Sequence, residues 1–304
     1  MMNYLLVVTL LAVARLSVAQ QQPDSFQISV SVNLVLLNPV VQDAKGQFVA
    51  SLQQHEFEVR EEGVPQTITV FRHEDVPVTV GLVIDHSGSM HRKLPDVLTA
   101  ARTFVKWSNP ADQMFIVNFN EKAALGLPPD RHFSNSPEEL EKAILSAPLA
   151  GQTAVYDAVA LALTRLPVGG PQKKVLIVIS DGGDNTSTLK LAELLKLTGQ
   201  SSALIYAIGI FDENETDRNP TALRRLASAS GGAAYFPEKT TDVIELCESI
   251  AHEIRNQYTV GYISSNPPKP GVFRPVKVTA HAPGKGHLVV RARTGYIAAG
   301  DEVK

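Results

Sequence analysis

Two aspartates stand at the ends of long apolar runs in this sequence. Asp85 closes the run "VTVGLVID" (78–85), and Asp181 closes "KVLIVISD" (174–181). Such runs are typical of strands buried on both faces of a parallel sheet, where ligands bind beyond the carboxyl ends of the strands. In a doubly wound sheet of order 3-2-1-4-5-6, these two runs are strands 1 and 4, which are neighbours. We therefore expect the two carboxylates to meet.

Hydroxyl side chains accompany both carboxylates. Ser87 and Ser89 alternate with Asp85 in the pattern D-x-S-x-S, and Thr153 lies in "GQTAVYDA" at the start of an expected helix. Two carboxylates in a partly dry crevice repel each other, and a proton or a cation relieves the repulsion. Because the neighbouring donors are hard oxygens, they suit Mg²⁺ or Mn²⁺ better than zinc or copper, and Ca²⁺ is a less favoured alternative. The expected metal ligands are Asp85, Ser87, Ser89, Thr153 and Asp181.

The elements that must position these residues follow an alternating strand and helix pattern between residues 76 and 256. The expected strands are 78–85, 113–120, 123–129, 174–181, 202–210 and 233–236. The segment 123–129 is expected at an edge, because its prolines cannot serve a central ladder. The predicted fold class is α/β, with a doubly wound, mainly parallel six-stranded sheet flanked by helices.

The flanks at 20–75 and 257–304 have a different pattern, with short alternating stretches separated by turn signals such as "DAKGQ" and "NPPKPG". Neither flank has enough strands to bury a core comfortably by itself. We therefore expect the two flanks to pair as one small all-β sandwich-like domain, with the α/β domain inserted between them.

The N-terminal segment 1–19 resembles a secretory signal. Its apolar run at 4–13 is too short to cross a bilayer, and the small residues before the expected cleavage after Ala19 suit a signal peptidase. The usual positive n-region is missing, so an uncleaved anchor remains the alternative. No later stretch of the sequence approaches transmembrane length. The mature chain is expected to be secreted, periplasmic or associated with the cell envelope.

The charge of the chain argues against a nucleic-acid partner, and its cysteine content excludes an intrachain disulfide. The net charge of −3, with scattered lysines and arginines, provides no extended basic face for a nucleic acid. Cys247 is the only cysteine, so no intrachain disulfide forms, and its place on an apolar helical stripe predicts a buried thiol.

The pattern Asp85-x-Ser87-x-Ser89, followed by Thr153 and Asp181, resembles the complete metal-ion-dependent adhesion site of von Willebrand factor type A domains, as in integrin I domains. The resemblance covers residues 76–256. The flanks also resemble those of exported bacterial proteins that carry this domain, although that match is weaker.

The resemblance implies that the serines and the threonine bind the metal directly or nearly so, and that the aspartates act directly or through water. It also implies that a carboxylate of a protein partner fills the last coordination position. The expected function is therefore non-enzymatic, cation-dependent capture of an acidic side chain of another protein.

Each motif residue has a plainer interpretation when it is considered alone. Ser87 or Ser89 caps the next helix, Thr153 caps its own helix, and Asp181 belongs to a turn. His86 is expected at the surface, since it points away from Ser87 in an extended segment and cannot serve it as a base. The run "HRK" (91–93) is expected to be a solvated helix start, with attraction of an acidic partner as the alternative.

Two rival functions remain open. A metal-assisted hydrolase at the same crevice would need a base beside the metal, and only Asp184 and His86 lie near these loops in the sequence. The other rival is a scaffold component with an incidental metal. A Rossmann oxidoreductase or an NTPase is disfavoured, because "DHSGSM" lacks the glycine spacing that phosphate binding needs.

Overall fold

The computed structural model describes residues 34–171, 173–181, 183–211, 218–267, 269 and 271–298. The expected signal segment, 1–19, lies outside the described residues. Residues 212–217 and Gly182 also lie outside them.

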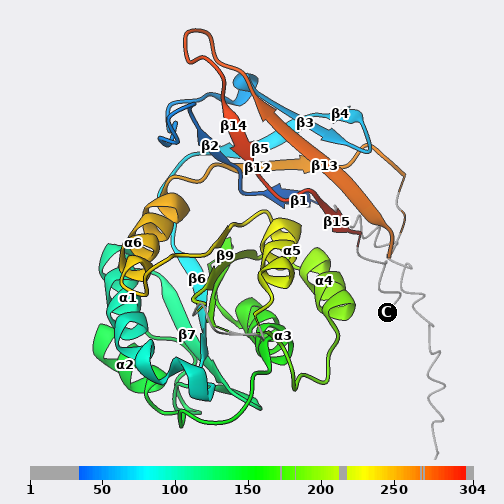
Figure 1. The fold of residues 1–304 in the computed structure, drawn as a ribbon. Helices are drawn as coiled ribbons and strands as arrows, with labels where there is room; N and C mark the ends of the chain where they lie inside the picture. The colour runs from blue at the N-terminus through cyan, green and yellow to red at the C-terminus, as the bar shows by residue number, and fades with distance from the viewer. Residues whose placement is uncertain are drawn as a thin grey trace, which may run out of the picture. The chain divides into compact units, whose positions relative to one another are not determined.

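A six-stranded sheet forms the centre of the α/β part, in the order β11-β10-β9-β6-β7-β8. Figure 1 labels its strands β9, β6 and β7. Its strands are β6 (Val78–Asp85), β7 (Gln113–Phe119), β8 (Ala123–Leu125), β9 (Lys173–Ser180), β10 (Leu204–Gly209) and β11 (Ala234–Tyr235). All neighbours are parallel except β8, which pairs antiparallel to β7 at the edge. The predicted strand order is confirmed, and β6 and β9 are neighbours as expected.

Six helices cover the two faces of this sheet among the described residues. They are α1 (Leu94–Trp107), α2 (Pro137–Ile144), α3 (Val155–Arg165), α4 (Leu191–Gln200), α5 (Pro220–Ser230) and α6 (Asp242–Arg255). α1 packs against α2 and α6, whereas α4 packs against α3 and α5 (Figure 1). Helices on both faces explain why every residue of β6 is buried and why its sequence, apart from Thr79, is apolar until Asp85.

The flanking strands pair across the sequence, as predicted. They are β1 (Leu34–Leu37), β2 (Val40–Gln42), β3 (Phe57–Glu61), β4 (Val64–Gln66), β5 (Ile68–Arg72), β12 (Thr259–Ile263), β13 (Phe273–Ala280), β14 (Val289–Arg291) and β15 (Gly295–Ile297). They form three sheets, β1-β12-β5, β15-β13-β3-β4 and β14-β2, around a shared apolar core. N-terminal β1, β2, β3 and β5 pair with C-terminal strands, so neither flank completes its sheets without the other.

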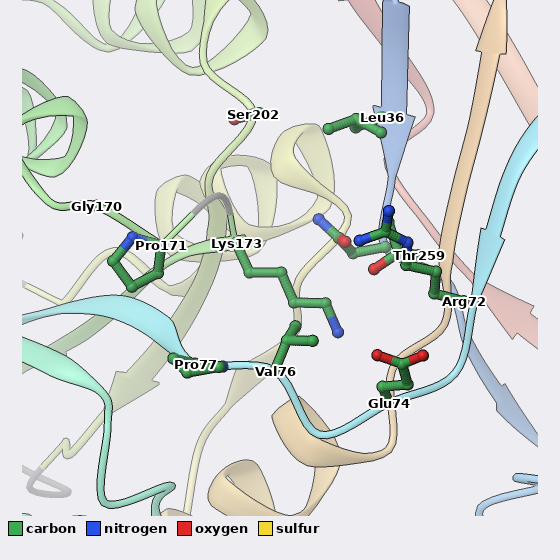
Figure 2. Close-up of a pocket in the computed structure, with 11 residues that line it drawn as sticks. Leu36, Arg72, Glu74, Val76, Pro77, Gly170, Pro171, Lys173, Ser202 and Thr259 are labelled. Carbon is green, nitrogen blue, oxygen red and sulfur yellow. The ribbon is translucent and has the colours of Figure 1, made fainter.

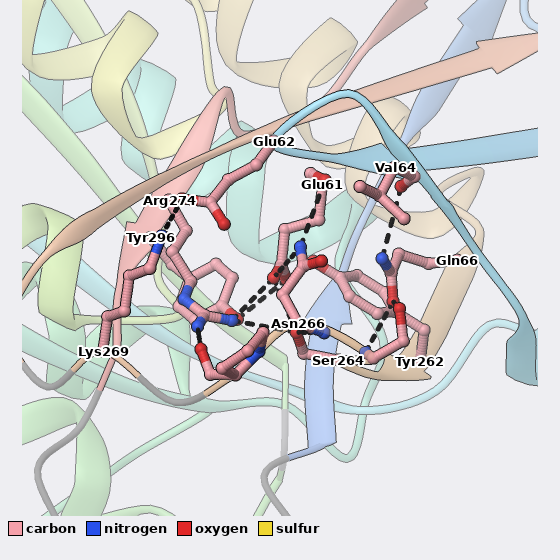
Figure 3. Close-up of polar contacts among 12 residues, drawn as sticks. Glu61, Glu62, Val64, Gln66, Tyr262, Ser264, Asn266, Lys269, Arg274 and Tyr296 are labelled. Carbon is pink, nitrogen blue, oxygen red and sulfur yellow. Dashed lines mark hydrogen bonds and ion pairs between the residues drawn. The ribbon is translucent and has the colours of Figure 1, made fainter.

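A buried carboxylate joins the two flanks within this core. Glu61, at the end of β3, is completely buried, and C-terminal side chains surround its oxygens (Figure 3). The groups that donate hydrogen bonds to it belong to Tyr262, Ser264, Asn266, Arg274 and Tyr296. Burial by itself raises the pKa of Glu61, but these hydrogen bonds outweigh it and hold the pKa below its ordinary value. Glu61 is therefore charged in the folded protein.

Two further findings bear on the sequence predictions. Cys247 is buried on α6, which confirms its expected packing. Among the residues that the structure describes, no helix is both long and apolar enough to span a membrane.

Candidate metal centre

Asp85 ends β6 inside the protein rather than at its surface. Its side chain is fully buried, and one carboxylate oxygen accepts a hydrogen bond from the Ser87 N–H at 2.8 Å. The other oxygen accepts one from the Ser180 hydroxyl at 2.6 Å. Burial raises the pKa of Asp85 to about 6, and the nearby charge of Asp181 adds to the rise, whereas the hydrogen bonds oppose it.

Asp181 lies beside Asp85, as the strand order predicted. Its Oδ1 accepts a hydrogen bond from Ser89 Oγ at 2.9 Å, and Ser87 Oγ lies 3.5 Å from the same atom. The two serine hydroxyls are 3.1 Å apart. Ser87 thus contacts both carboxylates, and four of the five expected ligands, Asp85, Ser87, Ser89 and Asp181, form one connected cluster.

Thr153 belongs to a loop that backbone hydrogen bonds attach to the same place. The His86 carbonyl accepts from the Ala150 N–H at 3.0 Å, and the Gly151 carbonyl accepts from the Gly88 N–H at 3.2 Å. Thr153 is buried, and its N–H donates to Asn185 Oδ1 at 2.9 Å. These bonds place the Thr153 loop against the loop that carries the two serines.

The simple capping interpretation of these hydroxyls is wrong for Ser87 and Thr153. Ser87 precedes a 3-10 helix over Gly88–Arg92, but its side chain makes no capping hydrogen bond. The residue that precedes α3 is Ala154 rather than Thr153. The first N–H groups of α3 donate instead to Asp184 Oδ1 and Ser187 Oγ, both at 3.1 Å.

The expectation for His86 is also wrong, because its side chain is buried rather than exposed. One ring nitrogen lies 3.1 Å from the Ile84 carbonyl and the other 2.9 Å from the Ile144 carbonyl. Burial lowers the pKa of His86. Because both ring nitrogens face backbone oxygens, the His86 ring has a structural role between β6 and the end of α2.

The expectation that residues 91–93 are solvated is wrong for Lys93. His91 and Arg92 are exposed as expected, but the Lys93 side chain is only 3% exposed. Its ammonium donates to Asp181 Oδ2 at 2.8 Å and to the Ile210 carbonyl at 3.1 Å. The repulsion between the two carboxylates is therefore relieved in part by a cation from the chain itself.

The signal for Lys93 was present in the sequence. A positive charge at the start of a helix is unfavourable beside the helix dipole, so it suggests a partner elsewhere. Ser180 and Asn185, which hold Asp85 and Thr153, were also missed. Both stand within "ISDGGDN", close to Asp181 and Asp184, but the sequence pattern gave their own side chains no role.

The donor set fits a hard divalent cation. Asp181 Oδ1 and the two serine hydroxyls converge beside Asp85, with the Thr153 loop adjacent. All of these groups present oxygen, the donor that Mg²⁺ and Mn²⁺ prefer. The chemistry of the donor set therefore agrees with the hard-cation site that the sequence predicts.

A cavity of about 360 Å³ lies at the other end of the sheet (Figure 2). Residues just before β6, such as Val76 and Pro77, line it together with Lys173 at the start of β9 and Arg72 of β5. The Lys173 ammonium donates to the Gln257 carbonyl at 3.2 Å, and burial lowers its pKa to about 8. This cavity is at the amino ends of the strands, so it is separate from the cluster at their carboxyl ends.

The sequence comparison identifies the family. Residues 79–249, more than half of the chain, match the von Willebrand factor type A domain, and the chain belongs to this family. Domains of this family are typically metal-dependent protein-interaction modules. The family resemblance drawn from the motif residues and the predicted fold class are thereby confirmed. No curated protein matches this chain.

Solved structures show the same fold at low sequence identity. A von Willebrand factor type A protein from Catenulispora acidiphila is 15% identical, with a TM-score of 0.54, and the match covers 82% of this chain and 76% of that one. Proximal thread matrix protein 1 from the mussel byssus, with a zinc-occupied MIDAS motif, is 17% identical, with a TM-score of 0.52. That second match covers 65% of this chain and 50% of the mussel protein.

Proposed function

We propose that this chain is an exported, non-enzymatic binding module that captures a protein partner through a divalent cation. The residues that would hold the cation are Asp85, Ser87, Ser89, Thr153 and Asp181. An Asp or Glu side chain of the partner would complete the coordination. The observation that carries this proposal is the convergence of Asp181 Oδ1 with Ser87 Oγ and Ser89 Oγ beside the buried Asp85.

The ligand set explains why a carboxylate would be captured. Hydroxyl groups are neutral, so they leave much of the charge of a divalent cation uncompensated. A carboxylate from outside then gains strongly by approaching, whereas a neutral side chain gains little. Mg²⁺ and Mn²⁺ suit the oxygen donors best, and the zinc-occupied motif of the mussel protein makes Zn²⁺ a necessary comparison.

The residues near the site support binding over hydrolysis. Asp184 Oδ1 accepts hydrogen bonds from the Tyr156 N–H at 3.1 Å and from the Ser187 hydroxyl at 2.5 Å. Burial raises the pKa of Asp184, while these hydrogen bonds oppose the rise. His86 faces two carbonyls. Both candidate bases therefore have structural roles, which favours the binding function over the hydrolase.

Export and domain organisation belong to the same proposal. Segment 1–19 would direct secretion, residues 76–256 would form the binding domain, and segments 20–75 and 257–304 would form the β-rich part. The mature chain would then reside outside the cytoplasm, where a protein partner with an exposed acidic side chain is accessible.

Calorimetric titration of Mg²⁺, Mn²⁺ and Zn²⁺ into EDTA-treated protein tests the metal site. We expect saturable one-site binding of Mg²⁺ and Mn²⁺ by the wild type and its loss in Asp85→Asn and Thr153→Val. Asp130→Asn, which removes an exposed carboxylate, is the matched control and should bind like the wild type. Equal binding by Asp85→Asn, or none by the wild type, would refute the proposed site.

Carboxylate capture has its own measurement. In the Mn²⁺-loaded protein, water-proton relaxation reports coordination positions that remain open to solvent. Acetate should lower this relaxation in the wild type as it displaces water, and acetamide at the same concentration should not. A relaxation that is insensitive to acetate would contradict carboxylate capture while leaving the metal site in place.

A further inference from the structure

Lys93 is a buried cation placed beside a proposed metal ligand. It is the residue that precedes α1, and its ammonium donates to Asp181 Oδ2 at 2.8 Å. The side chains of Lys93 and Asp181 are 3% and 1% exposed. Water screens such a pair only weakly, so each charge acts strongly on its surroundings.

The two oxygens of Asp181 have different partners. Oδ1 accepts from Ser89 Oγ, in the hydroxyl cluster, whereas Oδ2 accepts from Lys93. The Lys93 ammonium also donates to the Ile210 carbonyl, just beyond the end of β10. Lys93 therefore contacts Asp181 on the oxygen that the hydroxyl cluster does not use, and it leaves Oδ1 available.

We infer that Lys93, through its contact with Oδ2, neutralises the charge of Asp181. This contact lowers the affinity of the site for the metal and increases the attraction of the bound metal for an anion. This inference rests on the proposed function. Among the described residues, Lys93 pairs with Asp181, whereas the groups that donate hydrogen bonds to Asp85 are the neutral Ser87 N–H and Ser180 hydroxyl. A divalent cation held there keeps a net positive charge, which attracts a carboxylate from a partner.

The same contact stabilises the protein before metal binds. Removal of one partner of a buried ion pair leaves the other charge uncompensated, which is strongly destabilising. Lys93 connects the ends of β9 and β10 to the start of α1 through Asp181 and Ile210. A variant without the ammonium should therefore be less stable in EDTA, and metal should restore more of its stability than in the wild type.

Titration of Mn²⁺ into the full chain tests this inference directly. The variants are Lys93→Met, which removes the charge, and Lys93→Gln, which also keeps a hydrogen-bond donor in case the first variant folds poorly. Arg92→Met is the matched control, because Arg92 is the adjacent residue with the same charge but is exposed. Thermal melts of each protein, in EDTA and with saturating Mn²⁺, accompany the titrations.

We expect Lys93→Met and Lys93→Gln to bind Mn²⁺ about tenfold or more tightly than the wild type, because a nearby like charge has been removed. Arg92→Met should stay within about twofold, since an exposed charge is screened. The Mn²⁺-induced rise in melting temperature should be larger in both Lys93 variants than in the wild type.

The unfavourable outcomes are distinguishable. Equal or weaker Mn²⁺ binding by the Lys93 variants would overturn the inference and leave the metal site intact. Absence of Mn²⁺ binding in the wild type and in every variant would overturn the proposed function, and the inference with it. Binding by the Lys93 variants alone would overturn the proposed function of the wild-type chain, and the inference with it, because the ammonium would then exclude the metal altogether.

Discussion

Replacement of Glu61 by glutamine should destabilise the protein although the two side chains have nearly the same shape. Glu61 is completely buried, and its Oε2 accepts hydrogen bonds from the hydroxyls of Tyr262 and Tyr296 at 2.7 and 2.9 Å (Figure 3). Its Oε1 accepts from Arg274 Nη1 at 2.7 Å. The amide would remove the charge that balances Arg274 and would place a donor where one oxygen now accepts.

The size of the effect follows from these contacts. Loss of one partner from a buried ion pair costs about 3–5 kcal/mol, and hydrogen bonds to a charged group are each worth about 1.5–3 kcal/mol. The glutamine still accepts hydrogen bonds through its carbonyl, so we expect the lower end, about 3 kcal/mol. For a chain of 304 residues, an unfolding entropy of about 2.1 cal/mol/K per residue makes each kcal/mol worth about 1.6 °C, which gives a decrease of about 5 °C.

Differential scanning calorimetry of the full chain at pH 7 measures this decrease. Glu62→Gln is the matched control. Glu62 is the next residue, and it forms a partly exposed ion pair with Lys269 at 3.5 Å. A partly exposed pair of that kind contributes little, so the control should melt within about 2 °C of the wild type. A decrease smaller than about 2 °C for Glu61→Gln would refute the view that this carboxylate holds the two flanks together.

Two further predictions concern titration and thiol chemistry. Because the pKa of Glu61 is held below its ordinary value of 4.5, its contribution to stability is complete above pH 4.5 and disappears as the pH falls through the lowered value. The difference in melting temperature between the wild type and Glu61→Gln should thus be constant near neutral pH and shrink below pH 4.5; a difference that grows on acidification would contradict the assignment. Burial raises the pKa of Cys247 to about 12, so the native thiol should not react with Ellman's reagent at about pH 8 and should react fully in guanidinium. Rapid reaction of the folded protein would show that α6 opens readily.

Part of the proposed site could be predicted from the sequence, because the positions of its carboxylates depend on short stretches of the chain. An apolar run that ends in an aspartate marks both a buried strand and its carboxyl end, and strand order follows from the doubly wound pattern. The sequence alone therefore places Asp85 and Asp181 side by side. The structure confirms that β6 and β9 are neighbours. It also shows that Ser87 contacts both carboxylates.

The pairing of the flanks was predictable in outline but not in detail. Alternating stretches reveal strands, and their small number shows that each flank needs the other. Which strand pairs with which depends on contacts between segments more than 200 residues apart, such as Glu61 with Tyr262 and Arg274. A single sequence contains no local signal for such contacts.

The sequence by itself determined the class of the sheet, the position of the carboxylates at its ligand-binding edge, and the family motif. These depend on the order of apolar runs and on the residue that follows each run. The tertiary structure alone decided that His86 and Lys93 are buried, that Lys93 is paired with Asp181, and that Ser180 and Asn185 support the motif. The reason is physical, since the cost of burying a charge depends on which groups pack around it, and those groups come from distant parts of the chain.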